Sequence, residues 1–388
     1  MKPINWYFNR AALADNYLKS VGLGPIPRIA LLGVRRIGKT AFLLNDVAPK
    51  AIESGFFPVY INMWANLSSP QEHILNTLND YINIQKSGSV GSISALLSSE
   101  VKKLDINLGI IKASVDTNVP AKPVGTSNIE EINRLLKKLV KLTAEKDQRL
   151  LFILDEIQHL NTSAEFLPVQ ACLRTQFDTF EDICVIYAGS SRGGVSAMFN
   201  KDTTKFGGKV LSMPFYNSAS LVDFPRLDEK FVEFYHATLC DSFGLDYNLE
   251  ALIECFGSLD FSPFWFRMLV SELTTNRIPL AEALLKVNAR VQLDGGLDQV
   301  IAKMTQLDKI VFVRIYRQQT LYSNTALNEY AQQLGRKVNK GSVQNVVSKL
   351  KKAGVITEAD NKFFIEKVGL HEVLKANTNQ TGAEQECT

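Results

Sequence analysis

The sequence predicts an α/β fold: a parallel β-sheet covered by helices, then a helical region and a small C-terminal unit. Short, fully apolar segments recur between residues 28 and 224 and alternate with stretches of helical periodicity. Strands that alternate with helices form parallel sheets whose two faces are both covered. From about Pro225 the pattern becomes helical, and the last unit combines helices with a β-hairpin.

The bulk composition allows several domains and indicates no extreme class of protein. The chain has 388 residues, of which 46% are hydrophobic and 21% are charged, and its formal net charge is +3. Such a chain can form two or three domains with cores of their own. The expected regions are an N-terminal segment at 1–27, the sheet domain at 28–224 with an insert at about 86–128, a helical domain at 225–304, a C-terminal domain at 305–376 and a disordered tail at 377–388.

Cysteine and histidine usage predicts neither disulfides nor a zinc site. The five cysteines include no C-x-x-C pair, and the four histidines are scattered. The first residues, MKPINWYFNR, contain no apolar signal segment, and no run of 18 apolar residues occurs. We therefore expect a cytoplasmic protein without a membrane partner.

The first expected strand leads directly into a glycine-rich turn. Residues 28–32 (RIALL) are apolar and end at Gly33, and helical spacing then runs from 39 to about 53, where Gly55 ends the helix. The further elements expected here are strands at 57–63, 150–154 and 183–188 and helices at 70–85 and 129–145.

Residues 86–128 differ from their surroundings in composition. They are rich in Ser, Gly, Val and Asn, and polar and apolar residues alternate at 104–108 and 111–115 with Gly109 between them. Alternation of this kind is typical of strands. We expect a β-hairpin inserted into the larger domain, which serves as an interaction element.

The turn at 33–40 reads GVRRIGKT and matches the Walker A pattern without a gap. Its glycines let backbone N–H groups face phosphate oxygens, and the helix that begins here directs the positive end of its dipole at them. Lys39 would reach the β- and γ-phosphates, and the Thr40 hydroxyl would bind Mg²⁺. We therefore predict an ATP site with Mg²⁺ as cofactor. The residues expected to bind ATP here are Gly33, Val34, Arg35, Arg36, Ile37, Gly38, Lys39, Thr40 and Ala41.

The apolar strand at 151–154 ends in Asp155 and Glu156. A buried parallel strand carries Asp155 to the carboxyl edge of the sheet, where it would hold Mg²⁺ together with Thr40. Glu156 can polarise a water for attack on the γ-phosphate. This acidic pair favours ATP hydrolysis over a kinase reaction, because nothing in the sequence marks a site for an acceptor.

Positive charge is concentrated in residues 305–376, which contain 12 Lys and Arg but only 6 Asp and Glu. Helices are expected at 325–334 and 342–353, and strands at 355–357 and 362–366. This order of elements predicts a winged helix. The apolar stripe of its second helix consists of Val343, Val346, Val347 and Leu350.

The polar face of that second helix has side chains suited to base edges and phosphates. A face of this kind also suits protein docking or simple solvation, and the sequence leaves these alternatives open. The candidate DNA contacts are Arg336, Lys337, Lys340, Gln344, Asn345, Ser348, Lys349, Lys351 and Lys352.

Together these motifs resemble those of the archaeal-type and STAND-related ATPases, in the AAA+-like branch of the P-loop proteins. The resemblance rests on the turn at 33–40, the strand ending in Asp-Glu, and the later strand at 183–188 that ends in Gly-Ser-Ser-Arg. It extends to LVDFPRL at 221–227 and FSPF at 261–264, and it covers about residues 9–375. It implies a P-loop NTPase with an AAA+/ASCE-like parallel sheet, a helical lid and a winged helix.

The resemblance also implies roles for the residues after the strand at 183–188. Ser190 or Ser191 would sense the γ-phosphate, and Arg192 would contact it. The carboxyl end of a strand beside Asp155 is a suitable place for such groups. A solvated loop arginine is the alternative for Arg192. The residues expected in catalysis are thus Glu156, Ser191 and Arg192, and Ser190 joins those expected to bind ATP.

Two further features follow from the same resemblance. Pro263 would lie near the nucleotide base, although Ser262 stands where a glycine is common before this proline. Arg35, Arg36 and Arg174 are candidates for an arginine that acts across a subunit boundary. For Arg35 and Arg36, a plain surface charge is the alternative.

The leading functional hypothesis is an ATP-driven switch. Its nucleotide state would control self-assembly into a homo-oligomer and the engagement of a partner protein or double-stranded DNA. A DNA-loading or transposition-regulating ATPase is the second hypothesis, and DNA-stimulated hydrolysis with a steep salt dependence would favour it. The third is a sensor scaffold that keeps nucleotide bound and barely hydrolyses it.

Overall fold

The structure is a computed structural model that describes residues 4–88, 90–109, 120–201, 203–206, 209–295, 297–359, 362–366 and 370. The chain divides into two compact units. The sheet unit comprises Tyr7–Gly33 and Gly38–Pro225, and the helical unit comprises Arg226–Thr388 together with Met1–Trp6 and Val34–Ile37. Among the described residues, no helix is both long and apolar enough to span a membrane.

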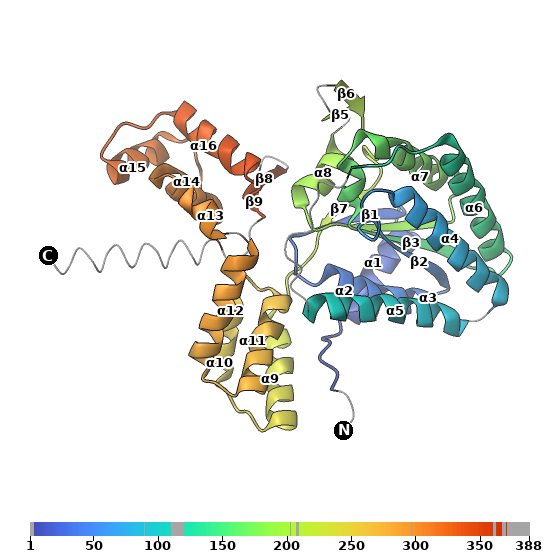
Figure 1. The fold of residues 1–388 in the computed structure, drawn as a ribbon, viewed down its shortest axis with the longest axis horizontal. Coiled ribbons are helices and arrows are strands. Elements are labelled where there is room, and N and C mark those ends of the chain that lie inside the picture. Colours follow the sequence, from blue (N-terminus) through green and yellow to red (C-terminus); the bar gives the residue numbers. More distant parts are fainter. Residues whose placement is uncertain are drawn as a thin grey trace. The chain divides into compact units, whose positions relative to one another are not determined.

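A parallel sheet forms the core of the sheet unit, as the sequence predicts, and its five strands have the order β2-β3-β4-β1-β7 (Figure 1). The sequence did not predict the last of these, β7. They are β1 (Arg28–Leu32), β2 (Phe56–Asn62), β3 (Arg149–Asp155), β4 (Ile183–Ala188) and β7 (Ser220–Asp223). β4 lies between β1 and β3, where Leu31 pairs with Ala188 and Leu154 with Tyr187. Because the strands are parallel, the residues that follow β1, β3 and β4 meet at one edge of the sheet.

Helices cover both faces of this sheet (Figure 1). On one face, α1 (Ala11–Leu23) and α5 (Val90–Gly109) pack against the helix that follows β1, which consists of α2 (Lys39–Phe42), the π-helical turn η1 (Leu43–Val47) and α3 (Ala48–Glu53). On the other, α4 (Pro70–Ser87), α6 (Thr126–Ala144) and α7 (Leu167–Thr179) lie side by side. This double cover explains why the central strands are apolar throughout. The remaining elements are η2 (Ile157–Asn161), η3 (Ala164–Phe166), α8 (Arg192–Asn200), β5 (Thr203–Phe206) and β6 (Lys209–Ser212).

The β-hairpin predicted within residues 86–128 is wrong for the part that the structure describes. The helix α5 includes the first predicted strand, 104–108, while the second, 111–115, lies outside the described residues. Ile93 and Leu97 are four positions apart and both buried. This four-residue spacing favours a helix, whereas the short alternation at 104–108 favours a strand. The segment forms a helix.

The helical unit begins with four helices around an aromatic core. They are α9 (Glu229–Phe243), α10 (Leu249–Ser258), α11 (Pro263–Asn276) and α12 (Leu280–Gly295), and the short α13 (Leu297–Ala302) follows. Phe231 on α9 contacts the rings of Phe256 and Phe266 on the next two helices, at centroid distances of 5.1 and 5.6 Å. These rings bury a large apolar area where the three helices meet.

The C-terminal part of the helical unit has the elements predicted for a winged helix. They are α14 (Gln306–Tyr316), α15 (Asn324–Leu334), α16 (Lys340–Lys352) and the hairpin of β8 (Ile356–Ala359) and β9 (Lys362–Ile365). The predicted apolar stripe of α16 is buried along its whole length, from Val343 to Leu350. The opposite face of α16 therefore remains for solvent or a partner.

Candidate functional site

The glycine-rich turn between β1 and α2 has the backbone that its sequence suggests. Gly38 has a φ of 89°, in the left-handed region, and directly precedes α2. A side chain at this position would be strained, so glycine is required here. The Lys39 side chain is buried at 6% exposure, and its Nζ donates a 2.6 Å hydrogen bond to the Gly33 carbonyl. The Lys39 side chain thus lies over the glycine-rich turn, where it would contact a phosphate bound to that turn.

The Asp155 carboxylate connects the end of β3 to this helix. It accepts hydrogen bonds from the Thr40 hydroxyl at 2.7 Å and the Tyr60 hydroxyl at 3.1 Å, and only 1% of the residue is exposed. Burial, and then repulsion from Glu156, raise the pKa of Asp155 above its usual range. A nearby cation would stabilise the ionised form. The hydroxyl and carboxylate oxygens are also the donors that Mg²⁺ prefers, so these residues fit the ion that the sequence implies.

Glu156 leaves the strand in an unusual backbone conformation, with a φ of 54°. Its carboxylate accepts hydrogen bonds from the Ser190 hydroxyl at 2.7 Å and the Ser190 backbone N–H at 3.3 Å. The Gln158 side-chain amide donates to the same carboxylate oxygen. Gly189 makes this arrangement possible, because a β-carbon there would come within 2.1 Å of Gln158 Oε1. The central position of β4 in the sheet thus brings Ser190 to Glu156, the predicted general base.

The two serines after β4 have different roles in the structure. While Ser190 contacts Glu156, the Ser191 hydroxyl accepts a 3.0 Å hydrogen bond from the Gly194 backbone N–H and caps α8. Arg192 forms an ion pair with Asp223 at the end of β7, and only 13% of its side chain is exposed. Arg192 is therefore not a solvated loop arginine, which was the alternative to its predicted role.

Arg36, from the middle of the turn, makes its contacts within the helical unit. Its guanidinium donates a 2.8 Å hydrogen bond to Asp294 and lies 4.3 and 4.6 Å from the ring centroids of Phe264 and Trp265. A carboxylate partner and two aromatic faces are favourable neighbours for a guanidinium. This environment differs from that of an isolated surface charge, which was the alternative for Arg36.

Ser262 stands where a glycine is common before the proline, and the hydrogen bonds of its side chain account for the serine. Ser262 is fully buried, and its hydroxyl donates a 3.1 Å hydrogen bond to the Arg36 carbonyl. The same oxygen caps α11, whose first residue is Pro263. Proline suits this first helical position because its missing N–H would have no partner there. The start of α11 thus accounts for both Ser262 and Pro263. The prediction that Pro263 lies near the nucleotide base stays a prediction.

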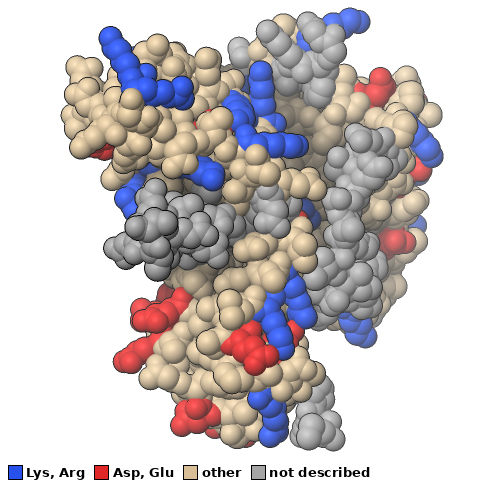
Figure 2. Space-filling view, turned by 60° about the vertical axis from the view of Figure 1, so that its left-hand side comes forward, with Lys and Arg blue, Asp and Glu red and all other residues tan. Residues whose placement is uncertain are grey.

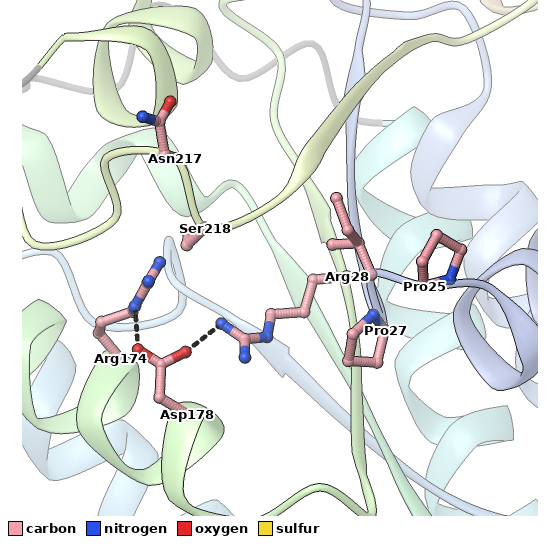
Figure 3. A pocket seen from close by; sticks show the side chains of 8 residues that line it. Pro25, Pro27, Arg28, Arg174, Asp178, Asn217 and Ser218 are labelled. Atoms are coloured by element: carbon pink, nitrogen blue, oxygen red, sulfur yellow. Dashed lines mark hydrogen bonds and ion pairs between the residues drawn. The ribbon is translucent and has the colours of Figure 1, made fainter.

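Arg174, the third arginine proposed to act across a subunit boundary, lies at the opposite edge of the sheet. It lines a cavity of about 240 Å³ that also contains Arg28, the first residue of β1 (Figure 3). Both guanidiniums pair with the Asp178 carboxylate between them. Because β1 runs from Arg28 towards Gly33, this cavity and the phosphate turn lie at opposite ends of the strand.

Two residues at the site were missed by the sequence analysis. Tyr60 lies on β2, where the register pairs Asn62 with Asp155, and its hydroxyl reaches the Asp155 carboxylate. Gln158 follows Glu156 by two positions and bridges it to Ser190, 3.2 Å from the Ser190 hydroxyl. Only the position of Gln158 two residues after Glu156 could have indicated its role, because the contact of Tyr60 depends on strand order.

The predicted DNA-contact residues on the helical unit separate into two groups. Lys349 forms an ion pair with Asp308, which is 2% exposed, and donates to the Lys303 carbonyl at 2.8 Å. Lys351 forms an ion pair with Glu358 on the hairpin. These two lysines have partners within the chain but remain exposed, so the prediction that they contact phosphates stays a prediction. The other candidates, which are also exposed, are Arg336, Lys337, Lys340, Gln344, Asn345, Ser348 and Lys352.

The surface view agrees with the concentration of positive charge in the C-terminal part of the sequence. Figure 2 shows Lys and Arg side chains gathered over the upper part of the face in view, with few Asp and Glu side chains among them. Acidic side chains are more frequent in the lower part of that face. Basic surfaces of this kind bind polyanions in some proteins and are simply solvated in others.

Comparison with known proteins supports the fold. The Walker-type ATPase PABY2304 of Pyrococcus abyssi is 18% identical to this chain, with 95% of this chain and 96% of that chain covered and a TM-score of 0.56. This similarity shows a shared fold over nearly the whole length. The Aeropyrum pernix ORC2 protein in its ADPNP–ADP complexes has 15% identity, coverages of 96% and 93%, and a TM-score of 0.47. The Aeropyrum pernix ORC1 protein in complex with DNA has 14% identity, coverages of 95% and 91%, and a TM-score of 0.42. The sequence matches no family model and no curated protein.

Proposed function

We propose that this protein binds ATP with Mg²⁺ at the turn and helix of residues 33–41 and hydrolyses it. The observation that carries the proposal is the 2.7 Å contact between the Thr40 hydroxyl and the Asp155 carboxylate. In P-loop ATPases, a hydroxyl at the start of the helix and a carboxylate at the end of a nearby strand hold the metal ion. Thr40 and Asp155 would hold Mg²⁺ here, and the ion would neutralise negative charge on the phosphates and on the buried carboxylate.

The surroundings of Lys39 support nucleotide binding. Its ammonium is held by the Gly33 carbonyl, at the end of β1 and beside the N-terminus of α2. A positive group and the free backbone N–H groups of a helix start together form an anion site. Lys39 would exchange its carbonyl partner for phosphate oxygens, and the turn would supply the remaining donors.

The position of Glu156 supports hydrolysis. Its carboxylate lies one residue beyond Asp155 and is oriented by Ser190 and Gln158. A general base must be both positioned and within reach of the water that it deprotonates. Ser190 would serve as the sensor, because its hydroxyl links the base to the end of β4, the strand between β1 and β3.

The test of this proposal is calorimetric titration with Mg-ATP combined with measurement of phosphate release. Thr40→Ala removes the metal-binding hydroxyl and should abolish the dependence on Mg²⁺. Thr179→Ala is a matched control, because Thr179 is an exposed threonine at the end of α7. A parent chain that does not bind Mg-ATP would refute the nucleotide site.

We propose further that the nucleotide state controls self-assembly and the engagement of a partner protein or double-stranded DNA by α16. The supporting observation is that α16 buries its apolar stripe and exposes Gln344, Asn345 and Ser348 on the other side. Amide and hydroxyl side chains can contact bases, and the neighbouring Lys352 can contact phosphates. Protein docking uses the same types of side chain, so both partners belong to the proposal.

Mass measurement in solution distinguishes this switch from its alternatives. The switch predicts a larger assembly with a slowly hydrolysed ATP analogue than without nucleotide. A DNA-loading ATPase would assemble only when duplex DNA is also present. A sensor scaffold would retain nucleotide after purification and release almost no phosphate. The absence of any change in mass with the analogue, alone or with DNA, would exclude nucleotide-controlled assembly.

A further inference from the structure

The helical unit brings together three side chains of metal-binding chemistry that the sequence analysis treated as unrelated. His236 and Cys240 are four positions apart on α9 and therefore lie on the same face of the helix. Asp246 follows the end of that helix, and its carboxylate lies beside both. The scattered positions of the histidines and cysteines did not predict this cluster, because only folding brings the third group to the helix.

The backbone at the end of α9 reverses the chain, so that Asp246 lies beside the helix that precedes it. Gly244 has a φ of 64°, and the Leu245 backbone N–H donates a 3.2 Å hydrogen bond to the Leu239 carbonyl. This pattern is typical of helices that end at a left-handed glycine, after which the chain reverses direction. The reversal places Asp246 against the last turns of the helix, two residues before Asn248, which caps α10.

The distances within this cluster match those of a tetrahedral zinc site. Zinc binds sulfur at about 2.3 Å and nitrogen or oxygen at about 2.0–2.2 Å, so tetrahedral ligand atoms lie roughly 3.4–3.6 Å apart. Here His236 Nε2 lies 3.4 Å from Asp246 Oδ1, and Cys240 Sγ lies 3.7 Å from each of these two atoms. All three separations agree with the expected edges to within about 0.1–0.2 Å.

We propose that His236, Cys240 and Asp246 form a binding site for a thiophilic divalent cation, with Zn²⁺ as the preferred ion. A thiolate, an imidazole and a carboxylate together suit zinc, whereas Mg²⁺ and Ca²⁺ select oxygen ligands. Asp246 has 89% of its side chain exposed, so the cluster opens to solvent and an ion can enter. A water molecule would complete the tetrahedron as the fourth ligand.

Ion binding requires two local changes. His236 Nε2 now lies 2.8 Å from the Tyr247 carbonyl and donates to it, so the ring proton must move to Nδ1 before Nε2 can bind a metal. Cys240 must lose its thiol proton. Desolvation and the nearby Asp246 carboxylate raise the pKa of this thiol, and a bound cation would reverse that effect. The bound ion would tie the end of α9 to the segment that begins α10.

The experiment uses the full chain with Cys387→Ser, which removes a thiol far from the cluster in sequence. Titration with Co²⁺, the spectroscopic probe for zinc sites, should produce a thiolate-to-cobalt charge-transfer absorption at one ion per chain, and Zn²⁺ should abolish it by displacement. Cys240→Ser should eliminate this absorption. Asp246→Asn should weaken cobalt binding by at least about tenfold, since even the loss of supporting residues around a metal ligand weakens binding by about 10- to 100-fold.

Asp241→Asn is the matched control, because Asp241 is an exposed acid on α9 outside the cluster. It should change the cobalt affinity much less than Asp246→Asn, because its carboxylate acts on Cys240 only through its charge and is not part of the cluster. A second readout is thermal stability, which Zn²⁺ should raise in the parent and not in Cys240→Ser. The proposal is overturned if the parent shows no charge-transfer absorption, if the Asp246 and Asp241 variants bind cobalt equally well, or if zinc stabilises Cys240→Ser as much as the parent.

Discussion

The Thr40 hydroxyl donates a 2.7 Å hydrogen bond to the Asp155 carboxylate, although 115 residues separate them in the sequence. β4 lies between the strands that lead to the two residues, so the contact crosses from the helix after β1 to the end of β3. The remaining contacts of Asp155, and its burial, make this carboxylate the centre of the proposed metal site.

Lys39→Ala should lower the affinity for Mg-ATP by at least about tenfold, because a hydrogen bond to a charged group contributes about 1.5–3 kcal/mol. The fold should be retained, since the lysine contacts the Gly33 carbonyl at the end of a strand and not an apolar core. Lys50→Ala, a change at a half-buried lysine of α3 on the same continuous helix, is the control for titration calorimetry. Equal affinities of the two variants would contradict the assigned role of Lys39.

Glu156→Gln should bind Mg-ATP with nearly the parent affinity but release phosphate at least about a hundredfold more slowly. The amide retains the size of the side chain but cannot accept the proton, and general bases contribute about 10²–10⁴ in rate. Glu165→Gln, at an exposed glutamate in η3, is the control. Phosphate release at the parent rate would show that another group activates the water.

Lys349→Ala should lower the free energy of unfolding by about 1–3 kcal/mol, because it leaves the buried Asp308 carboxylate without its cationic partner. Lys352→Ala, three positions further along α16, should change it by less than about 0.5 kcal/mol. Denaturant unfolding measures both. If the two variants are equally stable, the ion pair of Lys349 contributes nothing to the fold.

If α16 binds DNA, the combined change of Arg336, Lys337 and Lys352 to Ala should weaken duplex binding and lower the salt slope by about one unit per lost phosphate contact. Changing Gln344 and Asn345 should instead relax any sequence preference, because amides contact bases. Fluorescence anisotropy over a salt series tests both. A parent chain that does not bind duplex at low salt, with or without ATP, would favour protein docking.

Asp155→Asn should make the nucleotide-free chain more stable at pH 8 and have little effect at pH 4. Burial raises the pKa of Asp155 in the folded state to about 6, above its usual value of 3.8. The raised pKa means that the protonated Asp155 carboxyl stabilises the folded state. Its contribution to the free energy of unfolding is therefore complete below about pH 4 and declines as the pH rises through about 6. The variant has no such ionisation, so its advantage at high pH should be on the order of 1–3 kcal/mol.

Comparison of unfolding curves for parent and variant at the two pH values measures this difference. Mg-ATP should reverse the order at pH 8, because the cation favours the ionised aspartate and has no counterpart in the amide. An advantage for the variant that is the same at pH 4 and pH 8 would contradict the perturbed pKa.

The sequence by itself determined most of the secondary structure of the sheet unit. The helix expected from 39 to 53 and the strands expected at 28–32 and 183–188 have the predicted bounds, because glycines and apolar runs define them locally. The same holds for the apolar stripe of α16. The strand predicted at 104–108 is wrong because its pattern is too short. Five alternating residues do not outweigh a helix that is stabilised by burial elsewhere along its length.

Tertiary structure alone decided which side chains meet. The sequence placed Ser190 and Ser191 equally close to the site, and only the cap of α8 and the position of β4 separate them. It could not reveal the partner of Lys349, because Asp308 lies on another helix. The cluster of His236 with Asp246 likewise depends on a chain reversal after α9. Periodicity reports which face of an element is buried, whereas contacts between elements depend on strand order, turn geometry and packing, which no local pattern encodes.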